Sequence, residues 1–153
     1  MAPQAIYRRL SLTSFVFRRQ ATVEYGHCDP DGVVFVARLF QYFDTSTWLM
    51  LEAVLGVRPP DFMATIGIVP LVDVRVKCLK PVRFGDLMEL SSRVAEFRRS
   101  SFDVAHEIAV GGEPAVEGGE TRVWAVRDKD DPAKISSRAI PGDVIERFGG
   151  APR

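Results

Sequence analysis

The longest uninterrupted apolar segment of the chain covers residues 37–55 and predicts a single long helix. It contains no glycine or proline, and its apolar side chains occupy nearly every side of a helical projection. A helix that is apolar on all sides is one that protein surrounds. Gly56 is well placed to end it, Pro59 begins a shorter helical segment that reaches Ile66, and a last short helix is expected at 141–148.

Alternation of apolar and polar residues predicts strands on both sides of the long helix. Residues 15–25 are rich in Phe, Val, Thr and Tyr and predict the first strand. In the next strand, Val72, Val74, Val76 and Cys78 alternate with polar residues, as in a half-buried strand. Similar runs occupy residues 87–97, 102–110 and 121–127.

Glycine pairs at 111–112 and 118–119 predict turns between the later strands. The order is strand, helix and then four strands, with no second long helix to make parallel crossovers. We therefore expect an α+β fold in which an antiparallel sheet wraps around the central helix. The expected organisation is an N-terminal arm at residues 1–13, one domain at 14–149 and a tail at 150–153.

Composition excludes several classes of function. The 153 residues include 20 Lys plus Arg and 20 Asp plus Glu, so there is no net charge to hold a nucleic acid or an anionic membrane. Cys28 and Cys78 lack the spacing of a zinc site or a redox pair, which predicts no metal, reduced cysteines and a cytoplasmic location. No segment has the length of a transmembrane span or the pattern of a signal peptide.

The most informative segment is the predicted turn before the long helix, which runs from Tyr25 to Phe35 and reads YGHCDPDGVVF. It places Asp29 next to the helix N-terminus, whose backbone N–H groups favour negative charge. Two interpretations are open at this point. Asp29 is either a turn residue that precedes a proline or a carboxylate placed to meet a polarised carbonyl group.

Four segments in order resemble the 4-hydroxybenzoyl-CoA thioesterase family, which has the hotdog fold. The sharpest runs from Cys28 to Val34, is similar to the Asp-Pro-Ala-Gly-hydrophobic turn of that family, and precedes an aromatic-rich helix at the same spacing. The other three are Lys80-Pro81 with Gly85-Asp86-Leu87, residues 97–102 and residues 121–126. The resemblance extends from about Val16 to Phe148.

The resemblance implies a sheet of five or more antiparallel strands around the helix. It also implies a homodimer, or a homotetramer formed by two dimers, in which two copies join their sheets and the active sites lie at the boundary between chains. An all-round apolar helix agrees with this expectation, because one curved sheet covers only part of its circumference.

The resemblance also implies a chemistry for the turn. Asp29 matches the catalytic aspartate of the family, which either attacks the acyl carbon to give a mixed anhydride or acts as general base for water. The backbone N–H of Val36 would donate to the oxyanion. Gly32 and Phe35 would contact the substrate.

Asp44 matches an acidic residue of the family that contacts the ring hydroxyl of the acyl group. A buried carboxylate needs a hydrogen-bond partner. The alternatives to a phenolic hydroxyl are Thr47, Ser46 or a neighbouring subunit.

The phosphates of coenzyme A would bind Arg98, Arg99 and Ser100 by the same resemblance, since guanidinium groups suit such oxyanions. At the position of Ser100 the 4-hydroxybenzoyl enzyme has lysine, so this cluster departs from the family pattern.

The remaining candidates have structural interpretations. A backbone partner is expected for His27 at the end of the first strand. Core packing accounts for Cys28, Cys78 and His106, because no recognisable His and Asn arrangement accompanies a cysteine nucleophile.

The sequence therefore predicts an acyl-CoA thioesterase that releases a free acid and coenzyme A, with an aromatic, 4-hydroxybenzoyl-like acyl group favoured and no cofactor. One alternative is a hotdog enoyl-CoA hydratase or dehydratase, which would need a suitably placed helix histidine. The other is an acyl-CoA-binding protein without catalysis.

Overall fold

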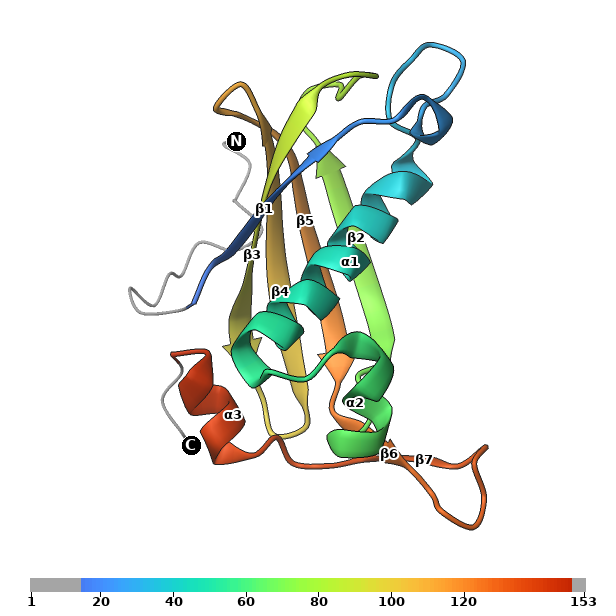
Figure 1. Cartoon of the computed structure of the whole chain (residues 1–153), viewed down its shortest axis with the longest axis vertical. Helices are drawn as coiled ribbons and strands as arrows, with labels where there is room; N and C mark the ends of the chain where they lie inside the picture. The colour runs from blue at the N-terminus through green and yellow to red at the C-terminus, as the bar shows by residue number, and fades with distance from the viewer. Residues whose placement is uncertain (1–14, 150–153) are drawn as a thin grey trace, which may run out of the picture.

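The computed structural model describes residues 15–149, and its centre is a five-stranded antiparallel sheet (Figure 1). The strand order is β1-β3-β4-β5-β2, so that β3, β4 and β5 form a consecutive meander and β1 and β2 form the edges. The strands are β1 (Phe17–Thr22), β2 (Leu71–Cys78), β3 (Leu87–Phe97), β4 (Ser101–Val110) and β5 (Glu113–Val123).

The helix α1 (Val36–Leu55) runs diagonally across one face of this sheet (Figure 1). It ends at Gly56, whose φ of 71° lies in the left-handed region that favours glycine. The shorter helix α2 (Pro59–Thr65) follows, with proline in its first turn. The two predicted helices are therefore confirmed.

The chain beyond β5 packs near the C-terminal end of α1. It forms a small hairpin of β6 (Ala125–Arg127) and β7 (Ile135–Ser137) and the predicted last helix, α3 (Gly142–Arg147). At the opposite end of α1, a single 3-10 turn, η1 (Tyr25–His27), leads from β1 toward the helix (Figure 1). The predicted arm at 1–13 and tail at 150–153 lie outside the described residues. Among residues 15–149, no helix is both long and apolar enough to cross a membrane.

The core fills the space between α1 and the sheet as two clusters. Around the first half of α1, Phe43 packs with Met88, Leu90, Ile108 and Val116; around the second half, Met50 and Leu51 pack with Val94, Phe102 and Trp124. Alternate residues of β3 point into these clusters, which is the pattern that predicted the strand. The sheet buries one side of α1, whereas Phe40, Trp48 and Leu49 stay half-buried.

One predicted turn is wrong. β5 runs without interruption from Glu113 to Val123, through the glycine pair at 118–119 that indicated a break. The reason is tertiary, because a Cβ atom on Gly118 would overlap the ring of Phe43 on α1. Gly118 therefore lets the central helix lie close against the sheet.

The predicted burial of β2 is also partly wrong. Val74 and Val76 are half-buried, but the side chain of Val72 is 59% exposed and Cys78 is exposed. The pairing of β2 with β5 shifts register between Leu71 and Asp73, and such a bulge takes Val72 out of the alternation. Core packing consequently does not account for Cys78, which lies at the end of an edge strand.

Candidate active site

Backbone hydrogen bonds fix the turn that carries Asp29. The Asp29 N–H donates to Val33 O at 2.8 Å, and the Gly32 N–H donates to Asp29 O at 3.0 Å. An isolated bridge pairs Cys28 with Val34 across the turn. Gly32 has a φ of 74°, which a side chain would disfavour. The sequence between β1 and α1 thus forms a closed, ordered loop.

The carboxylate of Asp29 is held by one of its two oxygens. Oδ1 accepts hydrogen bonds from the backbone N–H groups of Asp31 at 2.9 Å and Val33 at 3.1 Å. Oδ2 accepts no hydrogen bond from any described residue, and the side chain is half-buried. This geometry is that of a side chain that caps its own turn, but it also leaves one oriented oxygen available for chemistry.

The N-terminus of α1 lies next to this turn and has no side-chain cap. Phe35 is the N-cap residue, and its own N–H donates to His27 O at 2.9 Å. Val36 is the first residue of the helix, so its N–H has no carbonyl partner one turn earlier. The side chains of Phe35 and Val36 are 53% and 45% exposed, so solvent or a ligand can approach. The predicted site residues Asp29, Gly32, Phe35 and Val36 therefore gather at one end of α1.

His27 has a partner that the sequence did not indicate. Its Nδ1 lies 2.6 Å from the hydroxyl oxygen of Tyr42 on α1, and the two rings make an edge-to-face contact. Burial raises the pKa of Tyr42, so its hydroxyl keeps its proton at neutral pH. The prediction that a backbone group would bind the His27 ring is therefore wrong. The ring instead links the Asp29 turn to α1 through Tyr42.

Asp44 lies farther along α1, and both its burial and its partner differ from the prediction. Its side chain is 48% exposed, and Oδ1 accepts a hydrogen bond from Nη2 of Arg122 on β5. Ser46 instead accepts from Arg19 at 2.7 Å, and Thr47 donates to Glu120 at 2.7 Å. Neither of the predicted helix neighbours therefore binds Asp44.

Behind Asp44 lies a buried polar cluster that the sequence analysis missed. Glu120 and Arg122 alternate along β5 on the side that faces α1, and Glu120 Oε2 accepts from Arg122 Nε at 3.0 Å. Burial alone would raise the pKa of Glu120, but the neighbouring His106 and Arg122 outweigh it and lower the pKa to about 2. The sequence hid this cluster, because Glu120 and Arg122 share the strand face of Gly118 only when β5 continues through the glycine pair where a turn was predicted.

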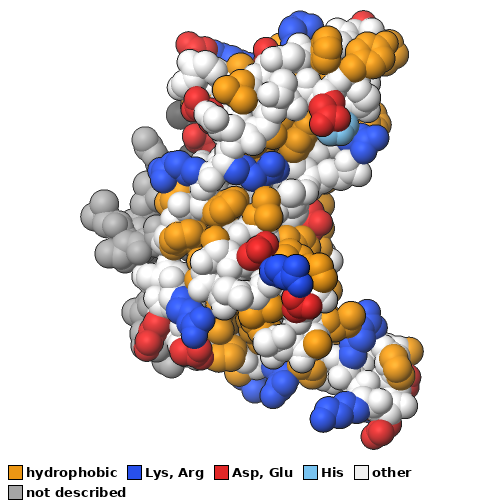
Figure 2. Space-filling view, in the orientation of Figure 1, with side chains coloured by type: hydrophobic (Ala, Val, Ile, Leu, Met, Phe, Trp, Pro, Cys, Tyr) orange, Lys and Arg blue, Asp and Glu red, His pale blue; other side chains and the backbone are white. Residues whose placement is uncertain are grey.

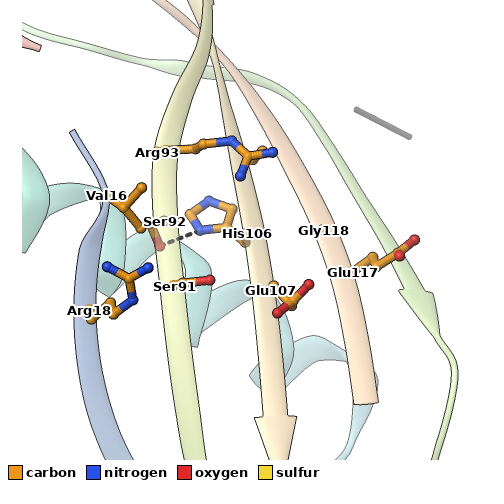
Figure 3. Close-up of a pocket in the computed structure, with 10 residues that line it drawn as sticks. Val16, Arg18, Ser91, Ser92, Arg93, His106, Glu107, Glu117 and Gly118 are labelled. Atoms are coloured by element: carbon orange, nitrogen blue, oxygen red, sulfur yellow. Dashed lines mark hydrogen bonds between the residues drawn. The ribbon is translucent and has the colours of Figure 1, made fainter. Parts of the chain in front are cut away.

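His106 completes this cluster as a neutral imidazole rather than as an apolar core residue. Its ring stacks on Phe43, and Ser92 Oγ lies 2.8 Å from Nδ1 (Figure 3). Thr47 Oγ1 lies 3.4 Å from Nε2 and already donates its one proton to Glu120. Nε2 therefore carries the ring proton and Nδ1 accepts from Ser92. Burial lowers the pKa of His106, which agrees with the neutral form.

The predicted coenzyme A residues lie at the other end of the molecule. Arg98, Arg99 and Ser100 form the turn between β3 and β4, whereas the Asp29 turn pairs with the segment just before β3. The 11 residues of β3 separate the two ends by about 30 Å. Arg98 also forms a two-pronged pair with Asp103, at 3.1 and 2.5 Å. One chain therefore does not bring Asp29 and this cluster into a single site.

A hollow of about 320 Å³ lies on the face of the sheet away from α1 (Figure 3). Charged residues from four strands surround it, including Arg18, Arg93, Glu107 and Glu117. None of the predicted site residues lines this hollow. Within residues 15–149, no group of three or more His, Cys, Asp or Glu side chains is arranged to hold a metal ion.

A family model described as the thioesterase superfamily matches residues 31–116, which is more than half of the chain. The protein belongs to the thioesterase superfamily and is a thioester hydrolase. The matched segment contains α1 and the strands β2, β3 and β4, and it begins just after Asp29.

The chain is similar to the 4-hydroxybenzoyl-CoA thioesterase of Pseudomonas sp. (strain CBS-3), with 25% identity over 137 residues that cover 83% of this chain and 93% of that protein. The solved structure of the 4-hydroxybenzoyl CoA thioesterase from that strain has a TM-score of 0.76 at 21% identity, covering 86% of this chain and 98% of the other. The resemblance and the hotdog fold that the sequence predicted are confirmed.

Two further solved structures have the same fold. A gentisyl-coenzyme A thioesterase has a TM-score of 0.71 at 24% identity, covering 85% of this chain and 98% of the other. A 1,4-dihydroxy-2-naphthoyl-CoA thioesterase from Synechocystis has a TM-score of 0.74 at 14% identity, covering 88% of this chain and 96% of the other. The protein is thus a hotdog-fold thioesterase related to 4-hydroxybenzoyl-CoA thioesterase.

Proposed function

We propose that this protein is an acyl-CoA thioesterase that releases a hydroxylated aromatic acid, with Asp29 as its catalytic carboxylate. One observation carries the proposal: an oriented carboxylate with a free oxygen lies beside the uncapped N-terminus of a long helix. This pairing supplies both a group that can attack or activate water and a donor for the developing oxyanion.

In the proposed reaction the thioester carbonyl lies between Asp29 Oδ2 and the start of α1. Either Oδ2 attacks the carbonyl carbon, or it takes a proton from a water molecule that attacks. Both routes place negative charge on the carbonyl oxygen, where the Val36 N–H donates and the helix dipole is favourable. Collapse breaks the carbon–sulfur bond and releases the coenzyme A thiolate. In the first route water then cleaves the mixed anhydride to the free acid.

The aromatic acyl group is proposed on two grounds. The three relatives described above are named for 4-hydroxybenzoyl, gentisyl and 1,4-dihydroxy-2-naphthoyl esters, all of which carry hydroxylated rings. In this chain, Asp44 is half-exposed and its Oδ2 accepts no hydrogen bond from a described residue. That oxygen is a suitable acceptor for a ring hydroxyl. Phe35 and Gly32 would contact the same substrate at the start of the helix.

The proposal includes a homo-oligomer joined through the free edge of β2. Leu71, Val72 and Leu79 are exposed along this edge, and only β5 pairs with β2 among the described residues. An unpaired apolar edge is a template for another strand. Hydrophobic side chains also reach the surface on the α1 face (Figure 2). A second copy would cover both, and its Arg98, Arg99 and Ser100 would be the groups that meet coenzyme A.

Thiol release from a panel of coenzyme A esters tests the function. The panel contains benzoyl, 4-hydroxybenzoyl, phenylacetyl, short aliphatic and enoyl esters. Asp29→Asn should lower kcat by about 10²-fold or more on every ester that the wild type hydrolyses, because the amide neither attacks nor takes a proton. The matched control is Asp31→Asn on the same turn, which should keep wild-type rates.

An Asp29→Asn variant with wild-type rates would remove Asp29 from the mechanism. Binding of the esters by the wild type without thiol release would instead indicate an acyl-CoA-binding protein. Hydration of the enoyl ester without thiol release would indicate the hydratase alternative.

A further inference from the structure

A buried pair of charged residues lies directly behind Asp44 and constrains what Asp44 can bind. We propose that Arg122 and Glu120 are positioning residues for substrate specificity: they hold Asp44 as an anionic acceptor that selects acyl groups with a neutral hydrogen-bond donor and excludes acyl groups that carry an anion. This inference rests on the proposed function, because it concerns which acyl group the same site accepts.

The buried side chain of Arg122 is held by Glu120, the Val69 carbonyl and the Trp48 ring. Its side chain is 2% exposed, and its Nε donates to Glu120 at 3.0 Å while Nη1 donates to Val69 O at 3.2 Å. The guanidinium carbon lies 5.8 Å from the centre of the Trp48 ring. Nη2 is thereby directed to Asp44 Oδ1. Because Glu120 and Val69 hold two of the three guanidinium nitrogens, the third is presented to Asp44 in a fixed direction.

The three side chains linked at Asp44 carry an excess of negative charge, while the next cation, Arg19, binds Ser46 and the Tyr42 carbonyl on α1. Arg122 contributes one positive charge, whereas Asp44 and Glu120 each contribute a carboxylate. His106 adds no charge, because its buried ring is neutral. Glu120 therefore already balances Arg122, and the carboxylate of Asp44 is the second anion against that one cation. Of the three charged groups, Asp44 is also the one that reaches the surface.

The consequence is that Asp44 should prefer acyl groups that donate a hydrogen bond over those that do not. Asp44 Oδ2 is an oriented acceptor without a donor among the described residues, and a hydrogen bond to a charged acceptor is stronger than a neutral one. A phenolic hydroxyl or an aromatic amine satisfies it. A methoxy group offers no proton, and a ring carboxylate brings a second negative charge beside a cluster that has one in excess.

Arg122→Lys tests the positioning role, with Arg58→Lys as the matched control. Arg58 pairs with Asp61 on the exposed surface of α2, away from the cluster. Lysine cannot reproduce the three directed donors. The ratio of kcat/KM for 4-hydroxybenzoyl-CoA over 4-methoxybenzoyl-CoA should fall by about tenfold or more in Arg122→Lys. It should be unchanged in Arg58→Lys.

Glu120→Gln provides a second test that keeps the shape of the side chain. The substitution removes one negative charge and leaves Arg122 and Asp44 as a neutral pair. Acyl groups that carry an anion should therefore be excluded less strongly. The ratio of kcat/KM for 4-carboxybenzoyl-CoA over benzoyl-CoA should rise several-fold. Thermal unfolding shows whether each variant is folded. If Arg122→Lys does not fold, the ester ratio measured with Glu120→Gln decides the inference.

A folded variant with wild-type ratios would overturn the inference. So would a uniform loss on all esters, because a merely structural role lowers every rate and leaves the ratios unchanged. These outcomes differ from failure of the proposed function, in which the wild type would hydrolyse none of the esters.

Discussion

Glu120 and His106 tie the stability of this protein to pH. The pKa of Glu120 is lowered from 4.5 to about 2 in the folded chain, so its contribution is present above pH 4.5 and is lost as the pH falls toward 2. That shift corresponds to about 3 kcal/mol of unfolding free energy. The pKa of His106 is lowered from 6.5 by burial, so below that pH the unfolded chain takes up a proton that the folded chain resists. Both groups therefore weaken the fold as the pH falls.

We expect the unfolding free energy to decrease in two steps on acidification, one below pH 6.5 and one below pH 4.5. Urea unfolding between pH 8 and pH 3 measures it. His106→Asn should remove the first step, and His27→Asn, at the other histidine of the chain, should leave it in place. If the unfolding free energy of both variants changes with pH as in the wild type between pH 7 and pH 5, His106 does not cause the first step.

At Gly118, the strand β5 lies directly against the central helix α1. Gly118 lies under the ring of Phe43, which also stacks on His106 from β4. Gly118→Ala should lower the unfolding free energy by about 1–3 kcal/mol, because the added methyl group overlaps a fully buried ring. The control is Gly142→Ala, where a Cβ meets nothing within 4 Å. Urea unfolding compares the two.

A second substitution separates this overlap from strand propensity. Adding Phe43→Leu should recover part of the loss caused by Gly118→Ala, since the smaller side chain makes room for the methyl group. Purely additive losses in the double variant would show that the two residues do not share the contact.

The elements that could be predicted are those whose signal is local. The helix at 37–55 and the strand at 87–97 follow from periodicity within one segment, and both are present. The Gly118 turn was wrong because the reason for that glycine lies on another element. The Asp29 turn could be recognised because its motif lies within one short segment. Asp44 and Arg122 are 78 residues apart, so their contact could not be predicted from the sequence.

At the scale of the whole molecule, the two proposed halves of the substrate site lie at opposite ends of one chain. Asp29 is at the start of α1, and the turn of Arg98, Arg99 and Ser100 is about 30 Å away along β3. If both serve one coenzyme A ester, they must come from different copies. The exposed edge of β2 gives a place where such copies can join.

Mixing two inactive variants tests this arrangement. Asp29→Asn lacks the catalytic carboxylate, and the double variant Arg98→Gln with Arg99→Gln lacks the proposed phosphate donors. The two variants are unfolded together and refolded as mixed oligomers. Random assortment then gives about a quarter of the sites both an intact Asp29 from one copy and an intact Arg98 and Arg99 from the other. Thiol release at low substrate concentration should then recover to about a quarter of the wild-type rate. Recovery would be absent if each site belonged to one chain, because every chain in the mixture carries a defect.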